Sequence, residues 1–182
     1  ALTKSEKEQL QVALKWAGYY TSSIDGAFGP GTRAAMAAWQ IDQGIAPTKV
    51  MTSEQRDFLL AKYNEVLQSL RLEVVTDLEA GIALKVPMNI VGFKQYAPPL
   101  VHFGSFTGTQ HSLYMISQTG DSASLSALYK ALQTLGTIPE TGKRKLKGNT
   151  FEINGQNSLI ISYATASLKN GQIKGFILVW PN

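Results

Sequence analysis

The first third of the chain places apolar residues at the spacing of an α-helix. One buried face is predicted from positions i, i+3, i+4 and i+7, occupied by Leu10, Ala13, Leu14 and Ala17. Thr3 and Glu6 stand three residues apart, as in a capping box, and Ser5 with Glu8 offers a second register. Gly18 follows where a helix end favours a residue with positive φ. The pattern therefore predicts a capped helix that ends just before Gly18.

Two further helices are predicted downstream. A glycine-rich loop around Pro30 interrupts the helical pattern, because glycine and proline both disfavour a continuous helix. Thr32 is expected to cap the second helix. The buried stripe of that helix would consist of Ala35, Met36 and Trp39. A third helix is expected to begin at Thr52 with Gln55. Its inner side would carry Phe58, Leu59, Tyr63, Val66 and Leu70.

Near residue 70 the pattern changes from helical spacing to short strands. Apolar runs bounded by turn residues predict strands at 72–76, 81–86, 100–106, 111–117, 150–154, 157–168 and 172–180. Asp121 or Ser122 is expected to cap a helix between the fourth and fifth strands. The Asn-Gly pairs at 154–155 and 170–171 are typical hairpin turns. They predict a three-stranded antiparallel meander with at least one helix on its face, within an α+β domain.

The segment from Gly18 to Gln40 also carries a motif. The residues concerned are Gly18, Tyr19, Asp25, Gly26, Phe28, Gly29, Thr32, Ala35, Met36, Trp39 and Gln40. Together they resemble the signature of the peptidoglycan-binding-like domains, which are three-helix modules found beside bacterial cell-wall hydrolases and in other exported proteins. The resemblance covers about residues 2–66. It implies an all-α module over residues 1–70, a partner in peptidoglycan or its stem peptides, and a periplasmic or otherwise exported location.

One position departs from that family pattern. The family usually has glycine after the Pro-Thr of its second loop, where this chain has Lys49. If the position needs positive φ, Lys49 is strained; we expect instead that the loop takes another turn. The ligand surface near this loop depends on which of the two holds.

Four residues are candidates for the ligand surface: Tyr19, Tyr20, Asp25 and Arg33. Tyr19, Tyr20 and Arg33 are expected to be exposed; tyrosines offer stacking area with a polar tip, and an arginine can hold a stem-peptide carboxylate through two hydrogen bonds. Asp25 has a second interpretation, in which it accepts backbone N–H groups of its own loop. The remaining motif residues are interpreted as structural: Gly18, Gly26, Phe28, Gly29, Thr32, Trp39 and Gln40. Gln11 and Gln40 are expected to tie loops to helices by hydrogen bonds.

Charge divides the chain of 182 residues unevenly. Residues 1–70 hold seven basic and seven acidic residues, whereas residues 71–182 hold ten and six. Four of those ten lie at Lys143–Lys147, which we interpret as a solvated loop and alternatively as a contact for anionic polymers or lipid headgroups. No aromatic residue stands beside this run, so no nucleic-acid binding is expected. No apolar run is long enough to cross a bilayer, so no membrane span is expected. Ala1 is expected to mark a processed or trimmed start.

Catalytic motifs are missing from the sequence. The chain has no cysteine, and its two histidines, His102 and His111, are too few for a catalytic zinc site without a third ligand. The segment 136–144 has one residue too many between its glycines for a phosphate-binding loop, and Arg144 replaces the required Ser or Thr. No serine-hydrolase motif is present. We therefore expect no enzyme activity within these residues, no cofactor and no metal.

Two functional hypotheses remain. The first is a non-catalytic cell-wall binding and targeting region of an exported bacterial protein. The second is a protein-interaction or regulatory region of a larger exported protein, with a partner or missing C-terminal domain such as a trypsin-like peptidase, and without glycan binding. The domain at 71–182 also resembles the PsbP/Mog1-like α+β proteins, whose strands likewise begin near a short apolar segment and a proline.

Overall fold

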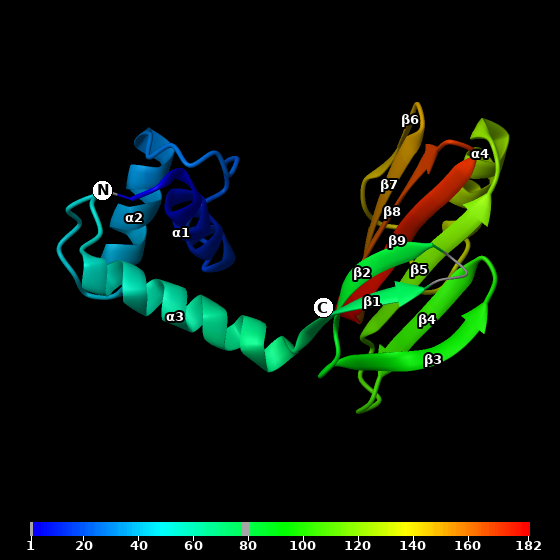
Figure 1. The fold of residues 1–182 in the computed structure, drawn as a ribbon, viewed down its shortest axis with the longest axis horizontal. Coiled ribbons are helices and arrows are strands. Elements are labelled where there is room, and N and C mark those ends of the chain that lie inside the picture. Colours follow the sequence, from blue (N-terminus) through cyan, green and yellow to red (C-terminus); the bar gives the residue numbers. More distant parts are fainter. Residues whose placement is uncertain (1, 78–80) are drawn as a thin grey trace. The chain divides into compact units, whose positions relative to one another are not determined.

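The computed structural model describes residues 2–77 and 81–182, and the chain divides into two compact units, Ala1–Ser69 and Leu70–Asn182. The first unit holds three helices and the second a mixture of strands and one helix (Figure 1). The fold class predicted from the sequence, a helical module followed by an α+β region with antiparallel sheets, is confirmed.

The first unit consists of α1 (Lys4–Trp16), α2 (Pro30–Asp42) and α3 (Ser53–Leu70). The capping box of α1 is confirmed, with Thr3 Oγ1 accepting from the N–H of Glu6 at 3.3 Å. Gly18 follows the helix with φ of 86°, as its position predicts. The core of the unit contains Leu10, Ala13, Leu14, Tyr20, Ala35, Met36, Trp39, Met51 and Leu59.

Two predictions about these helices are wrong. Thr32 does not cap α2, because Gly29 occupies the N-cap and Pro30 the first turn. Thr32 is instead buried inside the helix, where its hydroxyl donates to the carbonyl of Ala27 at 3.1 Å. The inner face predicted for α3 is also wrong at two positions, since Phe58 is 50% exposed and Val66 36% exposed. The residues of α3 that pack in or against the core are Leu59, Leu60 and Tyr63.

The second unit is built on antiparallel strands. A two-stranded sheet contains β1 (Leu72–Asp77) and β2 (Ile82–Pro87). A seven-stranded sheet has the order β3-β4-β5-β9-β8-β7-β6. Its strands are β3 (Val91–Ala97), β4 (Leu100–Ser105), β5 (Ser112–Thr119), β6 (Arg144–Lys147), β7 (Thr150–Gln156), β8 (Ile160–Lys169) and β9 (Gln172–Pro181). The chain reaches β6 through α4 (Ser122–Leu132), which begins at the predicted cap Asp121.

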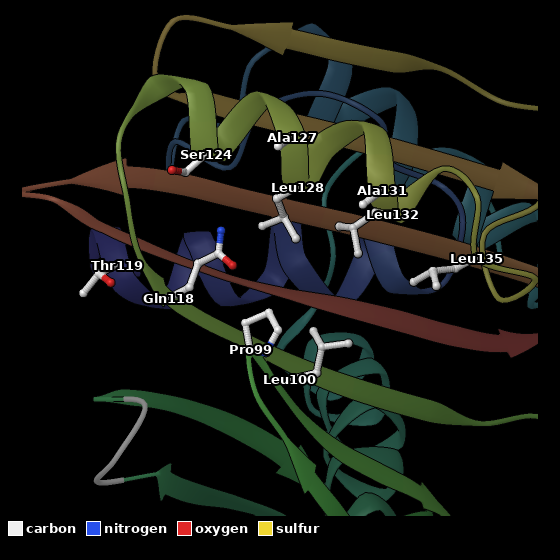
Figure 2. Close-up of a pocket in the computed structure, with 10 residues that line it drawn as sticks. All are labelled: Pro99, Leu100, Gln118, Thr119, Ser124, Ala127, Leu128, Ala131, Leu132 and Leu135. Atoms are coloured by element: carbon white, nitrogen blue, oxygen red, sulfur yellow. The ribbon is translucent and has the colours of Figure 1, made fainter.

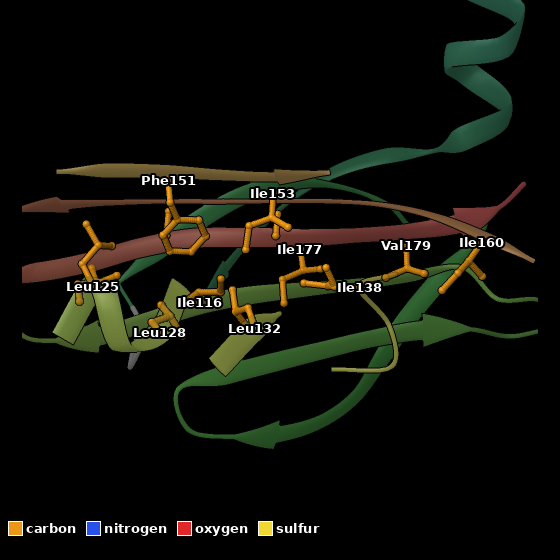
Figure 3. Packing of buried hydrophobic residues seen from close by; sticks show 13 residues of the cluster. Ile116, Leu125, Leu128, Leu132, Ile138, Phe151, Ile153, Ile160, Ile177 and Val179 are labelled. Carbon is orange, nitrogen blue, oxygen red and sulfur yellow. The ribbon is translucent and has the colours of Figure 1, made fainter. Parts of the chain in front are cut away.

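The large sheet buries a separate cluster on each face. Leu128 and Leu132 point from α4 toward one face (Figure 2), and the side chains of that cluster fill the space between helix and strands (Figure 3). On the other face, the β1–β2 hairpin covers the strands β3 to β5 with a second cluster that includes Val86, Phe103 and Met115. The alternation of side chains along each strand supplies both clusters from one sheet.

The strand predictions require three corrections. Asn154-Gly155 is not a turn but lies inside β7, where a Cβ on Gly155 would approach the carbonyl oxygen of Pro139 to 2.8 Å. The β7–β8 turn is made by Asn157, whose Oδ1 accepts from the N–H groups of Leu159 and Ile160. The second pair, Asn170-Gly171, is the predicted hairpin turn, with φ of 52° and 72°.

The other two corrections concern strand count. The predicted three-stranded meander is part of a seven-stranded sheet, which also includes β3, a strand that the sequence pattern did not indicate. The basic run predicted as a loop forms edge strand β6 over Arg144–Lys147. It lacks the apolar alternation by which strands are recognised, because an edge strand with one weakly covered face does not need it.

Candidate functional site

A buried glutamine of α1 organises the first loop of the helical module. Gln11 is fully buried, and its Oε1 accepts from the backbone N–H groups of Asp25 at 3.0 Å and Gly26 at 2.8 Å. Its Nε2 lies within hydrogen-bonding distance of Asp25 Oδ1 at 2.8 Å and of the Ala27 carbonyl at 3.0 Å. Buried polar groups of a loop need such partners, so one side chain fixes residues 25–27 of the loop between α1 and α2.

A second buried glutamine performs the same task for the loop between α2 and α3. Gln40 Nε2 donates to Thr48 Oγ1 and to the carbonyl of Val50, both at 3.0 Å. Its Oε1 accepts from the backbone N–H of Lys49 at 3.2 Å. Lys49 has φ of 63°, so the expectation of another turn is wrong and the strained alternative holds.

Between these two fixed loops lies a cavity of about 220 Å³. Its lining combines apolar and basic residues from the N-terminal segment, the three helices and the two loops. They are Leu2, Lys7, Leu10, Phe28, Arg33, Met36, Lys49, Val50, Met51 and Arg56. Four of the ten are cations, and none of the described residues in the lining is acidic. We call this cavity the cationic groove.

The four cations are held in different ways. Lys7 Nζ lies 6.0 Å from the ring centroid of Phe28, in a cation–π arrangement. Arg56 donates to the Met51 carbonyl at 3.0 Å and to Ser53 Oγ at 2.9 Å, which fixes its guanidinium at the rim. Arg33 and Lys49 are exposed, and within residues 2–77 and 81–182 neither side chain has a hydrogen bond or an ion pair. Excess positive charge over an apolar floor suits an anionic group attached to small apolar substituents.

The structure separates the four ligand candidates predicted from the sequence. Arg33 lines the cationic groove, and the other three do not. Tyr20 is only 6% exposed, so its predicted exposure is wrong: its ring packs in the core and its hydroxyl donates to the Ser23 carbonyl at 2.7 Å. Asp25 is exposed but accepts from the N–H of Ala27 at 2.8 Å, besides Gln11. Tyr20 and Asp25 meet at Gln11, as parts of the loop scaffold.

Tyr19 and Asp25 have shifted pKa values. A hydrogen bond to Asp42 raises the pKa of Tyr19, with partial burial as a smaller cause. Hydrogen bonds from Gln11 and then from the Ala27 N–H lower the pKa of Asp25. Both shifts have local structural causes that lie outside the cationic groove.

Sequence reasoning did not include Lys7, Lys49 and Arg56 among the ligand candidates. The replacement of glycine by Lys49 was the one local signal, since a bulky residue at positive φ marks a position where strain is tolerated. Lys7 and Arg56 stand on different helices, 49 positions apart in the numbering, so no local motif connects them. Phe28, interpreted as structural, is half-buried and forms one wall of the groove.

The second unit holds a larger cavity of about 600 Å³ between α4 and strands β4 and β5 (Figure 2). Its lining is mostly apolar, with Leu100, Leu132 and Leu135 on the walls and Gln118 at one end. His102 stacks on Tyr114 with ring centroids 4.3 Å apart, and burial followed by the charge of Lys94 lowers its pKa. Within the described ranges, no three His, Asp or Glu side chains converge as metal ligands would.

No helix in the described parts of the chain is both long and apolar enough to cross a membrane. The comparisons with known proteins bear on the first unit. Residues 3–59 match the family described as "Putative peptidoglycan binding domain". The resemblance noted from the motif at Gly18–Gln40 is thereby confirmed, and the rest of the chain has no assigned family. A search of curated proteins gave no match. The resemblance of residues 71–182 to PsbP/Mog1-like proteins stays a prediction.

Proposed function

We propose that this chain is a non-catalytic region that binds peptidoglycan through the cationic groove and so targets an exported bacterial protein to the cell wall. The observation that carries this proposal is the groove itself, which has four cations, apolar residues and no acidic residue in its lining. All of the lining residues except Leu2 lie within the segment that matches the peptidoglycan-binding family. The family match supports the class of polymer, and the groove supports the part of the polymer that is bound.

The part that fits is the stem peptide. Stem peptides present carboxylates next to the methyl groups of alanine residues, which is the combination of anionic and small apolar groups that the groove can accept. Arg33 supplies a free guanidinium for bidentate contact with a carboxylate, while Arg56 is already oriented by Met51 and Ser53. The wall formed by Phe28 and Val50 can cover the methyl groups.

We further propose that the chain has no hydrolytic or transferase activity. Covalent catalysis needs a nucleophile beside a base, and metal catalysis needs clustered ligands. His111 Nδ1 is 2.9 Å from Thr109 Oγ1 on an exposed turn, and His102 contacts Ser112 at 3.4 Å with its ring stacked on Tyr114. Neither histidine has a carboxylate orienter among the described hydrogen bonds. Zymography on peptidoglycan and on casein, with and without zinc, should show no clearing.

Binding is tested by co-sedimentation of the full chain with purified sacculi. Arg33→Ala should lower the affinity about tenfold, the loss expected for one charge-assisted contact. The matched control is Lys62→Ala, which also removes one exposed cation but lies on α3 outside the groove. Binding should weaken as salt rises, because exposed charges are screened. Equal binding by both variants would place the site elsewhere.

The second hypothesis predicts a different result in the same experiment. If the chain is an interaction or regulatory region, for example ahead of a trypsin-like peptidase domain, the wild type will not pellet with sacculi at any salt concentration. The apolar cavity beside α4 is the observation that favours a protein partner, because an open apolar surface of this kind is typical of binding sites.

A further inference from the structure

One face of the large sheet is only half covered. The residues of β5 and β9 that pack under the β1–β2 hairpin include Leu113, Met115 and Leu178. The pairing register places Leu178 opposite Tyr163 of β8, so Tyr163 lies on the same face as the hairpin. Strands β8, β7 and β6 continue that face beyond the residues in the hairpin cluster. We call the part of this face on β6 to β9 the open face.

Aromatic side chains gather on the open face. Tyr163, Phe176 and Trp180 all face this side, since each pairs with or alternates in step with Leu178. All three are half-buried, and none belongs to the buried clusters found among the described residues. The rings of Tyr163 and Phe176 lie 6.0 Å apart at an angle of 52°. They form a platform of rings rather than part of the core.

Positive charge surrounds these rings. The register places Lys145 and Lys147 of edge strand β6 on the open face, opposite Glu152 and Thr150 of β7. Lys174 of β9 lies at the border with the hairpin, where its Nζ donates to Ser117 Oγ at 2.6 Å and is 3.5 Å from the place of a Cβ on Gly81. Glu152 is the only acidic residue in the four strands. The two β6 lysines therefore leave the β6 side of the open face with a net positive charge.

Polar groups of β7 lie on the open face beside the rings, further along the strand than the positions opposite the two β6 lysines. Asn154 and Gln156 of β7 are exposed and share the face, because they pair with Tyr163 and Ile161. Their amides can both donate and accept hydrogen bonds. Across three strand spacings the face is about 14 Å wide from β6 to β9, with Lys145 and Lys147 on β6, the amides on β7 and the rings on β8 and β9.

We propose that the open face binds the glycan strand of peptidoglycan itself. Sugar rings present C–H faces that stack on aromatic rings, and hydroxyl and acetamido groups that hydrogen-bond to amides. Where the stem peptide has been removed, each muramic acid residue also carries a lactyl carboxylate that lysines attract. The open face offers all three complements, and because it spans four neighbouring strands it suits an extended chain rather than a compact ligand. The identification of peptidoglycan as the polymer rests on the proposed function of the first unit. The location of the binding site rests on the residues of the open face alone.

The test uses glycan strands from which an amidase has removed the stem peptides. These strands lack the group proposed to bind the cationic groove, keep the sugars, and carry the lactyl carboxylates that the amidase exposes. The full chain is titrated with them, and binding is followed by tryptophan fluorescence and by sedimentation. A double variant, Tyr163→Thr with Lys147→Glu, should weaken binding at least tenfold. Threonine retains the tendency to form a strand, and circular dichroism reports whether the sheet is intact.

Two control variants separate the possible outcomes. Lys85→Glu with Lys130→Glu reverses two exposed lysines outside the open face and should leave glycan binding within about twofold. Arg33→Ala should also leave it unchanged, although it impairs binding to intact sacculi if the proposed function is right. If the proposed function is wrong, Arg33→Ala will bind intact sacculi as tightly as the wild type, whatever the result with free strands.

Three results would overturn the proposal. The first is the absence of binding to free glycan strands. The second is binding that the Tyr163→Thr, Lys147→Glu variant retains. The third concerns nucleic acid, which basic and aromatic platforms also bind: a twenty-nucleotide thymidine oligomer that binds more tightly than the strands, and loses affinity in the same variant, would assign the face to that class of polymer.

Discussion

The backbone N–H of Lys49 donates to Oε1 of Gln40 at 3.2 Å, and this contact holds Lys49 at φ of 63° on the rim of the cationic groove. A side chain with a Cβ in this conformation costs roughly 1–2 kcal/mol relative to ordinary backbone geometry. Strain of this kind persists where surrounding contacts over-determine the backbone, and it is common beside ligand sites.

Replacement of Lys49 should separate stability from binding. Lys49→Gly removes both the strain and the charge, whereas Lys49→Ala removes the charge and keeps the Cβ. We expect Lys49→Gly to be more stable than Lys49→Ala by about 1 kcal/mol, the relief being reduced by the larger unfolded-state entropy of glycine. Both variants should bind sacculi equally weakly. Urea denaturation measures the first effect and co-sedimentation the second; equal stabilities would show that the backbone is not strained.

Substitution of Gln11 should lower the free energy of unfolding of the helical module more than substitution of most of its other polar residues. Gln11→Leu leaves the N–H groups of Asp25 and Gly26 without their acceptor in a buried setting. Each orphaned group costs about 1–3 kcal/mol, so we expect a loss of roughly 2–4 kcal/mol in the free energy of unfolding. Gln9→Leu, at an exposed position of the same helix, is the matched control and should change stability by less than about 0.5 kcal/mol.

The module should lose stability in acid partly through Asp25. Hydrogen bonds from Gln11 and from Ala27 lower its pKa below the ordinary value of 3.8, so the ionised carboxylate stabilises the fold above that pH. This contribution is lost as pH falls through the lowered pKa. Asp25→Asn retains an acceptor oxygen but cannot titrate, and should therefore show a shallower decline in stability below about pH 4. The stability of both proteins is followed by helical circular dichroism as the pH is lowered. An equally steep decline in the wild type and in Asp25→Asn would contradict this account.

The sheet unit contains one buried hydroxyl whose removal should be favourable. Ser162 is 1% exposed, and its Oγ has no hydrogen-bond partner among the described residues. Ser162→Ala removes the desolvated group, so we expect stability to stay the same or rise by about 1 kcal/mol. Ser167→Ala changes an exposed position of the same strand and should be neutral. A clear loss in Ser162→Ala alone would mean that a buried water or another partner satisfies the hydroxyl.

The two compact units should fold independently. The cores of the helical module and of the sheet unit share no residue among their buried clusters. A fragment of residues 1–69 should therefore give a cooperative helical melt, and a fragment of residues 70–182 a separate β-type melt. The full chain should reproduce both transitions. A random-coil spectrum from either fragment would show that its unit depends on the other.

Sequence reasoning recovered the elements whose signals are local. The capping box at Thr3, the cap at Asp121 and the turn at Asn170-Gly171 are decided within a few residues, and all three were predicted correctly. The turn expected at Asn154-Gly155 failed because a long-range approach to Pro139 uses the same dipeptide inside a strand. Local chemistry permits both outcomes, and tertiary contacts select between them.

The site was less accessible from the sequence for a related reason. Arg33 was a candidate because an exposed arginine can bind a carboxylate. The other cations of the groove, Lys7 and Arg56, come beside it only when α1 and α3 pack against α2. Tyr20 was misplaced because an exposed tyrosine and a buried one with a satisfied hydroxyl have the same local sequence signal. On the open face the aromatic residues come from β8 and β9, whereas the basic run forms β6. The absence of aromatic residues beside this run in the sequence therefore did not indicate that the folded sheet brings rings to the same face.

The two outer strands of the large sheet have a consequence for how the protein behaves at high concentration. Edge strands offer free backbone groups to which another chain can add, the first step of fibril growth. Here β3 is interrupted by a register shift between Phe93 and Gln95, and β6 carries Lys145 and Lys147 along its length. The register shift hinders the addition of another chain at β3, and the repulsion between lysines hinders it at β6. Aggregation should accordingly begin at β6 when its lysines are neutralised, by acetylation for example, and not when their charge is reversed.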